Sequence, residues 1–235
     1  MDRFEIIILL IMAFLPPIVY AIWIRNTEKY HREKWIPIFL CFLWGATIAV
    51  IAALILEVVL HFTLFPSIND YNLIILISAI FIAPFAEEFT KPLALRLKRV
   101  KRELDELEDG LIYGAVAGLG FSATENLLYG YSSLQESFLF FIILISIRSI
   151  GGCLLHASAT AWTGYGYGKV VMKHSKFISI LPYFLLAMLI HSLYNGLVAF
   201  GIYGVGAGLF AAIGITIATI TLVRKKIKTL DSLNP

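Results

Sequence analysis

Long apolar stretches separated by short polar segments make up almost the whole chain. An α-helix rises about 1.5 Å per residue, so it needs about 20 residues to cross the hydrocarbon of a bilayer. The stretches that meet this length are roughly residues 4–24, 36–60, 71–95, 110–131, 137–166, 177–200 and 203–223. No internal repeat and no polar linker divides them. The pattern predicts an all-α, polytopic integral membrane protein with about seven spans, forming one domain over residues 1–235.

Composition agrees with a membrane protein. Hydrophobic residues make up 59% of the 235 residues and charged residues 15%, with a mean hydropathy of +0.84. A soluble domain has too little interior to bury that much apolar surface, so we expect the lipid bilayer as a partner and no nucleic acid. Cys41 and Cys153 both lie inside apolar stretches. We interpret them as small buried hydrophobic residues rather than a disulfide or a zinc pair.

Lys and Arg residues alternate between the two ends of the predicted helices. The segments that contain them are 25–35, 91–109, 169–176 and 224–228. The connections between these segments, at the other end of the helices, contain none. Because basic residues near membrane spans favour the cytoplasmic side, the pattern predicts a multi-pass protein of the cell membrane. Its N-terminus is expected outside and its C-terminus in the cytoplasm.

A small set of ionisable residues interrupts the apolar spans. They are Glu57, Glu87, Glu88, Lys91, Glu125, Arg148, His156 and His191. A charged side chain at the middle of a bilayer costs about 3 kcal/mol on insertion scales. Several such charges are compatible with a stable protein only if they face one another or water. We therefore expect the spans to surround a polar intramembrane cavity.

The stretch "FIAPFAEEFTKPLAL" (81–95) carries three of these charges in one helix. Glu87 and Lys91 are four residues apart, which places them on one helical face. Pro84 and Pro92 lack the backbone N–H that an interior helical residue donates, and each crowds the carbonyl four residues earlier. The helix is therefore expected to be irregular on both sides of the glutamates, which a membrane tolerates only beside protein or water.

The later spans carry matching polar residues. The fourth span has Glu125 and Asn126, and its glycines, Gly114, Gly118 and Gly120, form a surface that another helix can approach closely. Arg148 and His156 lie on one slowly drifting stripe of the fifth span. His191 and Asn195 lie four residues apart on the sixth.

The polar residues fall at different depths in the membrane when they are counted from the loops. Counted from the loops, Glu87 falls in the half of the membrane nearer the Lys-rich ends, whereas Glu125 and His191 fall in the other half. One common site then requires helices that are offset or tilted, or span edges that differ by about a turn. The charged connector "LKRVKRELDELEDG" (97–110) has its basic residues before its acidic ones, which opposes the dipole of a single helix. We assign that connector no function.

The buried carboxylates and imidazoles allow two kinds of hydrolysis. A carboxylate can take a proton from water while His and Asn side chains donate hydrogen bonds to an oxyanion. In the alternative, a divalent metal activates the water, and the candidate ligands are Glu87, Glu125, His156 and His191. No pairing of serine or cysteine with histidine indicates a covalent nucleophile. The residues by themselves leave both kinds open.

Four motifs, in chain order, resemble those of the PrsW family of glutamic-type intramembrane proteases. They are "EEFTK" (87–91), "FSATEN" (121–126), Arg148 with His156, and "HSLYN" (191–195). The run "DGLIYGAVAGLGFSATEN" (109–126) is especially similar. The family belongs to the wider superfamily of CAAX-processing and bacteriocin-protection endopeptidases, and the resemblance covers about residues 87–196.

The resemblance implies an intramembrane endopeptidase that hydrolyses a peptide bond in a membrane-associated protein or peptide substrate. It implies that Glu87 activates the water and that Glu88 supports it, by orienting neighbours or holding Lys91. It favours water activated by glutamate, so no cofactor is expected, and a divalent metal remains the alternative.

The same resemblance implies roles on the other helices. Glu125 stands where the wider superfamily has a histidine, and His156 would supply the missing imidazole. His191 and Asn195 match the pair that stabilises the oxyanion. Apart from the resemblance, Asn126 and Arg148 are expected to be supporting residues, with Arg148 as a structural counter-ion to the glutamates.

Two other classes of function use similar residues. A non-enzymatic scaffold is one, since a gamma-secretase subunit is a distant relative that does not itself cleave. A proton-coupled transporter is the other, because buried Glu, His and Arg can relay protons. The complete set of Glu87, Glu125, His156 and His191 is evidence against the scaffold. The lack of an internal repeat is evidence against the transporter.

Overall fold

The fold is a bundle of helices. The computed structural model describes residues 3–66, 68, 70–202 and 206–233, and within these ranges the regular structure consists of helices without strands. The elements are α1 (Arg3–Arg25), α2 (Trp35–Trp44), η1 (Gly45–Ala49), α3 (Val50–Leu64), α4 (Tyr71–Ile77), η2 (Ser78–Ile82), α5 (Ala83–Thr90), η3 (Lys91–Arg96), α6 (Lys98–Lys101), α7 (Leu107–Glu136), α8 (Phe138–Lys173), η4 (Phe177–Ile180), α9 (Leu181–Ile202) and α10 (Ala207–Asp231). The predicted all-α class is confirmed.

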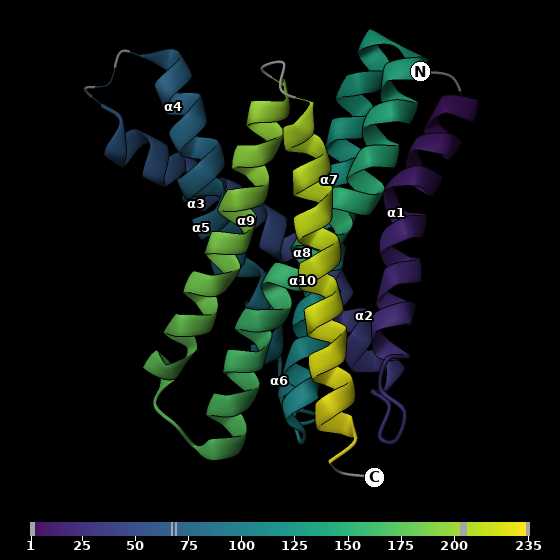
Figure 1. Ribbon diagram of the computed structural model, residues 1–235, viewed down its shortest axis with the longest axis vertical. Helices are drawn as coiled ribbons and strands as arrows, with labels where there is room; N and C mark the ends of the chain where they lie inside the picture. The colour runs from purple at the N-terminus through teal and green to yellow at the C-terminus, as the bar shows by residue number, and fades with distance from the viewer. Residues whose placement is uncertain (1–2, 67, 69, 203–205, 234–235) are drawn as a thin grey trace.

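Consecutive crossings alternate in direction, so the two termini lie at opposite ends of the bundle (Figure 1). By length and composition, six described segments can cross a membrane: Arg3–Arg25, Trp35–Leu64, Tyr71–Arg96, Phe138–Lys173, Phe177–Ala199 and Ala207–Asp231. These confirm a polytopic membrane protein. The last predicted span, 203–223, begins in residues 203–205, which lie outside the described residues, and α10 forms the rest of it. Which end of the bundle faces the cytoplasm remains a prediction.

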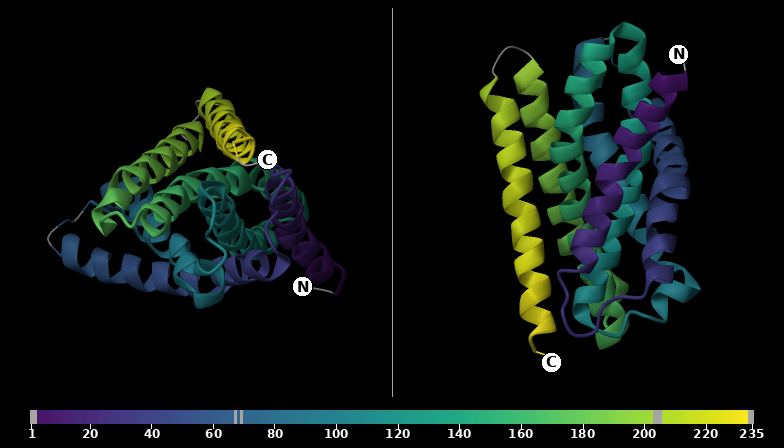
Figure 2. Two further views of the ribbon diagram at one scale, coloured as in Figure 1. Left: turned by 90° about the horizontal axis from the view of Figure 1, so that it is seen from below. Right: turned by 90° about the vertical axis from the view of Figure 1, so that its right-hand side faces the viewer.

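The α7 helix, at the place of the predicted span 110–131, is not among these six, and it is enclosed by protein. It packs against α1, α2, α8 and α10, and every residue from Glu108 to Ala123 is buried (Figure 2). Because neighbouring helices rather than lipid cover it, α7 can be less apolar than the outer helices. A Cβ at Gly118 would lie 2.1 Å from the carbonyl oxygen of His156, and one at Gly120 would lie 2.0 Å from that of Phe42. The predicted close-packing surface is therefore confirmed on two sides of α7.

The third crossing is irregular on both sides of the glutamates, as the two prolines predict. Its backbone is a π-helix over η2, an α-helix over α5 and a 3-10 helix over η3. Pro84 lies in the first turn of α5, and Pro92 lies in the first turn of η3. The glutamates thus occupy eight residues of regular helix between two irregular turns.

The charged connector over residues 97–110 is helical in part. The chain leaves helical geometry after α6, and Glu106 then forms a capping box with Asp109 at the start of α7. The acidic residues therefore lie at the N-terminus of a new helix, where the helix dipole stabilises negative charge. The charge order therefore does not oppose a helix dipole, because the basic and acidic halves lie in separate helices.

Candidate active site

Glu87, Glu88 and Lys91 project into the centre of the bundle from α5 and η3. Glu87 is 6% exposed, and both Glu88 and Lys91 are fully buried. The Lys91 Nζ lies 2.9 Å from Glu87 Oε2 and 2.8 Å from Glu88 Oε1. One ammonium group therefore neutralises two adjacent carboxylates, in the i,i+3 and i,i+4 positions that a helical turn brings together.

Glu88 is held by donors from three elements. In addition to Lys91, the Nδ1 of His191 on α9 lies 2.9 Å from Glu88 Oε1, and Thr160 on α8 donates its hydroxyl to Glu88 Oε2 at 2.9 Å. A buried carboxylate is stable when charged and neutral donors satisfy its oxygens. Glu88 therefore connects α5, α8 and α9 and fixes the orientation of the His191 ring.

His156 on α8 lies between Lys91 and Glu125. Its Nδ1 is 2.8 Å from the Lys91 Nζ, and its Nε2 is 2.6 Å from Glu125 Oε2. An ammonium group has only donors, so Nδ1 must accept from Lys91, and Nε2 must carry the hydrogen that it donates to Glu125. Glu125 therefore fixes both the tautomer and the position of this imidazole.

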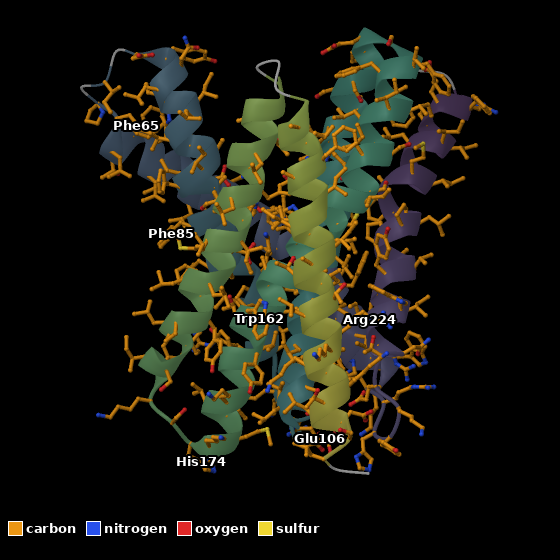
Figure 3. The ribbon with its side chains drawn as sticks, in the orientation of Figure 1. Phe65, Phe85, Glu106, Trp162, His174 and Arg224 are labelled. Carbon is orange, nitrogen blue, oxygen red and sulfur yellow. The ribbon has the colours of Figure 1, made fainter. Side chains whose placement is uncertain are left out.

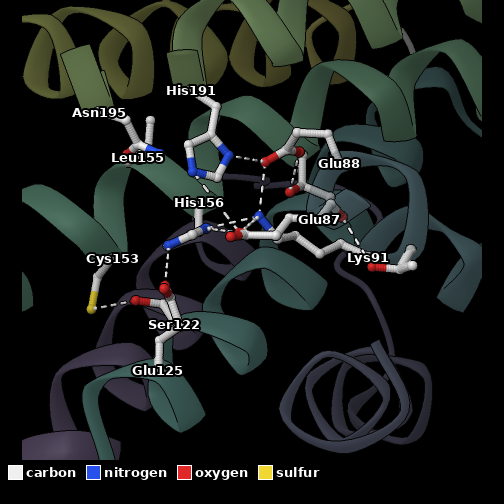
Figure 4. Close-up of polar contacts among 12 residues, drawn as sticks. Glu87, Glu88, Lys91, Ser122, Glu125, Cys153, Leu155, His156, His191 and Asn195 are labelled. Atoms are coloured by element: carbon white, nitrogen blue, oxygen red, sulfur yellow. Dashed lines mark hydrogen bonds and ion pairs between the residues drawn. The ribbon is translucent and has the colours of Figure 1, made fainter. Parts of the chain in front are cut away.

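One ring edge of each imidazole faces Glu87 (Figure 4). Glu87 Oε2 lies 3.6 Å from His156 Nδ1 and 3.9 Å from His191 Nε2, and the ring planes are nearly perpendicular, with centroids 5.1 Å apart. Within the described part of the chain, this oxygen has the Lys91 ion pair but accepts no well-oriented hydrogen bond. Glu87 is thus the carboxylate of the cluster with an oxygen available for another ligand.

Arg148 closes the cluster behind Glu125. Its Nη2 lies 3.1 Å from Glu125 Oε2, its Nε donates to Asn126 Oδ1 at 3.0 Å, and its guanidinium stacks 4.0 Å from the centre of the Tyr129 ring. Arg148 and Asn126 therefore lie beside the cluster, in the positions expected of supporting residues.

Asn195 points away from this cluster. Its side-chain amide donates a 2.8 Å hydrogen bond to the carbonyl oxygen of Ala79, inside the π-helical turn η2. A π-turn and the proline that follows leave backbone carbonyls without their usual helical donors. Asn195 thus fastens α9 to the irregular turn before Glu87, and the structure does not bring it together with the other expected site residues.

The polar residues meet although loop counting puts them at different depths. Glu125 lies roughly 27 Å along α7 from its start at Leu107, and His156 lies a similar distance before the end of α8. Glu87 is much nearer the end of η3, but α6 and the turn after it continue the chain to the start of α7 (Figure 1). The expected offset between helices is therefore present.

Two participants were not identified from the sequence. Thr160 donates to Glu88, and the Phe121 ring lies 4.5 Å from the Lys91 ammonium. Thr160 follows His156 by four residues, so an i,i+4 search around each buried histidine would have found it. The face of Phe121 supports a buried cation through its negative quadrupole.

Two cavities flank the cluster. One, of about 400 Å³, is lined by Glu88 and by apolar side chains that include Phe85, Phe89, Phe184 and Leu181. The other, of about 620 Å³, lies between α3 and the α4–α5 crossing and is lined by residues that include Glu57, His61 and Ile82. Phe85 marks the first cavity in Figure 3. Both cavities are mainly apolar, which suits hydrophobic side chains of a membrane-embedded ligand.

Comparison with known proteins identifies the family. A family model described as "PrsW family intramembrane metalloprotease" matches residues 33–223. The chain belongs to this family. A protease PrsW from Clostridioides difficile (strain 630) is 30% identical over 193 residues, which are 82% of this chain and 78% of that protein.

A second PrsW protease, from Halalkalibacterium halodurans (strain C-125), is 33% identical over 126 residues, 52% of this chain and 54% of that protein. No solved structure matches the chain. The resemblance to the PrsW family is therefore confirmed. The scaffold and transporter alternatives are not favoured, since both relatives carry the name of a protease.

The family description implies a metal, and the cluster contains suitable ligands. One atom each from Glu87, His156 and His191 lies within 4.8 Å of the others, and all three residues are buried. A carboxylate and two imidazoles are a ligand set used by catalytic zinc. Glu125 and Glu88 bond to the opposite ring nitrogens, as carboxylates behind metal-bound histidines do. The residues fit a metal, with the Lys91 ammonium as the competing cation at the same place.

Proposed function

We propose that this chain hydrolyses a peptide bond in a membrane-associated protein substrate and that Glu87 activates the attacking water. The proposal rests on the position of Glu87 Oε2, which lies 3.6 Å from His156 Nδ1 and 3.9 Å from His191 Nε2. Glu87 is the carboxylate of this group with a free acceptor oxygen, whereas Glu88 and Glu125 are held by their neighbours. Membership of the PrsW family supports the reaction class.

In this proposal Glu87 works as general base and then as general acid. Its carboxylate takes a proton from water as the water oxygen bonds to the carbonyl carbon of the substrate. The carbon–nitrogen bond then breaks, and Glu87 delivers the proton to the departing nitrogen, so a new carboxyl group and a new amine are released. His156 holds the Lys91 ammonium beside Glu87 through its Nδ1, and Glu125 keeps that ring edge directed toward Glu87.

His191 is assigned to the oxyanion. Its Nδ1 is held by Glu88, and its Nε2, on the side of Glu87, would donate to the negative oxygen of the tetrahedral intermediate. Asn195, expected to share this role, is assigned instead to positioning the backbone before Glu87.

A metal is compatible with the same residues. Glu87, His156 and His191 would hold it, and it would lower the pKa of a bound water to about 7 and polarise the peptide carbonyl. Glu125, the fourth residue of the expected ligand set, would then hold His156 from behind rather than ligate the metal.

The cavity that contains Glu88 is assigned to the substrate. Its phenyl rings from Phe85, Phe89 and Phe184 form an apolar wall next to the polar cluster. Such a wall accepts hydrophobic side chains of a transmembrane segment. The remaining partners are the bilayer itself and the substrate protein.

The test is cleavage of a tagged single-span substrate in membranes by wild type and by Glu87→Gln and Glu125→Gln variants. We expect Glu87→Gln to abolish cleavage and Glu125→Gln to reduce it. Wild-type rates in both variants would disprove the catalytic assignment. Metal analysis of the purified protein decides between the two ways of activating water.

A further inference from the structure

A second group of buried carboxylates lies far from the active site, at the end of the bundle that contains the C-terminus. Glu28 comes from the segment between α1 and α2, Glu108 from the first turn of α7, and Asp231 from the last residue of α10. Their exposed fractions are 0%, 1% and 4%. Glu106, labelled in Figure 3, marks this region. Three segments distant in sequence thus bring acidic groups into one buried place.

Backbone hydrogen bonds hold two of these carboxylates in position. The amides of Lys29 and Tyr30 donate to the two oxygens of Asp231, at 3.0 and 3.1 Å. The amide of Glu33 donates to Glu28 Oε2 at 3.0 Å. The loop and the end of α10 are therefore fixed to each other, and their carboxylates are pre-positioned rather than free to turn toward water.

These carboxylates form no short-range ion pair among the described residues, although Arg25 is close enough to interact with Glu28 electrostatically. Glu28 Oε1 and Glu108 Oε1 are both buried and accept no hydrogen bond. Among the residues that the structure describes, no Lys, Arg or His side chain forms an ion pair with Glu28, Glu108 or Asp231, although several basic residues occur in neighbouring segments. The active site is different, because Lys91 and Arg148 form ion pairs with its glutamates. Buried carboxylates without a counter-charge are strongly unfavourable, so this place favours a cation.

The donor spacing matches a metal ion. One oxygen each from Glu28, Glu108 and Asp231 lies within 4.8 Å of the other two. Two oxygens on opposite sides of Ca²⁺ are about 4.6–5.2 Å apart, and two on opposite sides of Mg²⁺ are about 4.0–4.2 Å apart. The ligands are all oxygen atoms, the type that these hard cations prefer. Three oxygens at this spacing can therefore surround one ion with little movement.

We propose that Glu28, Glu108 and Asp231 bind one hard divalent cation, Ca²⁺ or Mg²⁺, separate from the active site. The cation fastens the loop before α2 and the end of α10 to the first turn of α7. Because α7 carries Glu125, the site stabilises the helix that positions His156. The inference does not rest on the proposed proteolysis.

Binding is tested on the purified full-length protein in detergent, by calorimetric titration with CaCl₂ and with MgCl₂ after removal of metals with EDTA. The Glu87→Gln variant serves as the parent protein, so that binding at the active-site cluster is weakened. Glu28→Gln and Glu108→Gln remove negative charge at nearly constant volume. Glu103→Gln is the matched control, because Glu103 forms a partly exposed ion pair with Lys34 near the same end.

We expect the parent protein and the Glu103→Gln control to bind one ion per chain. Saturating cation should raise their Tm by about 5 °C or more. Glu28→Gln and Glu108→Gln should weaken binding at least tenfold and lose the rise in Tm. Absence of binding by the parent protein overturns the proposal. Equal binding by all variants overturns it as well, and so does a Tm that responds to acidification but not to either cation.

Discussion

Glu125 Oε2 on α7 and His156 Nε2 on α8 lie 2.6 Å apart, at the place where glycines bring these helices into close contact. Since Nδ1 of the same ring accepts from Lys91, the Glu125 contact determines which edge of His156 faces Glu87. The packing of α7 against α8 therefore also fixes the orientation of the His156 ring.

Glu125→Gln should reduce cleavage by about 10–100-fold, the range typical for carboxylates that orient a ligating or catalytic histidine. The amide oxygen can still accept from His156 Nε2, so the fold should survive. Loss of the charge, however, weakens both this bond and the Arg148 ion pair. Single-turnover cleavage measures the effect, and a rate equal to that of wild type would contradict the positioning role.

Gly118→Ala should reduce both stability and cleavage. The added Cβ would lie 2.1 Å from the carbonyl oxygen of His156, so α7 and α8 must separate. Overpacking of this kind costs about 1–3 kcal/mol. Gly214→Ala on α10 is the control, since nothing lies within 4 Å of a Cβ there. Thermal unfolding compares the two variants, and an equal Tm for both would show that the close contact does not matter.

Thr160→Val should destabilise the protein by about 1.5–3 kcal/mol, the usual value of a hydrogen bond to a charged group. It removes the donor to Glu88 Oε2 from a fully buried site at nearly constant shape. Thr163→Val, on the same helix, is the matched control because the buried Thr163 hydroxyl has no partner among the described residues. Denaturant unfolding should give a lower free energy of unfolding for Thr160→Val than for Thr163→Val. A similar decrease in both variants would exclude a special role for Thr160.

Stability should fall as the pH rises, through Glu33 in the loop before α2. Burial raises the pKa of Glu33 to about 10, and the neighbouring Asp109 and Glu28 add to the rise, whereas the hydrogen bond from Tyr113 lowers it. In the unfolded chain the pKa of this carboxyl has its ordinary value of 4.5. At pH values between these two pKa values, the folded state binds more protons than the unfolded state. The free energy of unfolding is therefore highest at low pH and decreases as the pH rises.

Thermal unfolding in EDTA between pH 6 and pH 9 measures this effect. One such group contributes at most about 1.4 kcal/mol per pH unit. Glu33→Gln should flatten the decline, because it can still accept from Tyr113 but cannot ionise. Glu103→Gln should leave the slope unchanged. The same slope in wild type and Glu33→Gln would assign the pH dependence to another group.

The sequence predicted the features that follow from the cost of placing charge in lipid. The helical fold, the irregular third crossing and the meeting of Glu87, Lys91, Glu125, His156 and His191 all follow from that cost and from helical spacing. These forces act on residue types and positions that are visible in the chain itself.

Features that depend on local backbone detail could not be predicted. The target of Asn195 is a carbonyl in another helix, and only the actual π-helical turn makes that carbonyl available. The acidic group of Glu28, Glu108 and Asp231 joins residues up to 203 positions apart, with no spacing rule to indicate it. Because the chain leaves helical geometry after α6, Glu108 lies in the first turn of α7, where the helix dipole stabilises its negative charge.

Cleavage of a tagged single-span substrate by Glu87→Gln is the direct test of Glu87 as the general base. Glu57→Gln is the control, because Glu57 lines the neighbouring cavity. Glutamine keeps the shape of the side chain but cannot take a proton from water, and general-base catalysis contributes about 10²–10⁴-fold. We expect at least a 100-fold lower rate for a folded Glu87→Gln protein, as judged by its Tm, and near wild-type cleavage by Glu57→Gln. A folded Glu87→Gln protein that cleaves within a few-fold of the wild-type rate would contradict this role of Glu87.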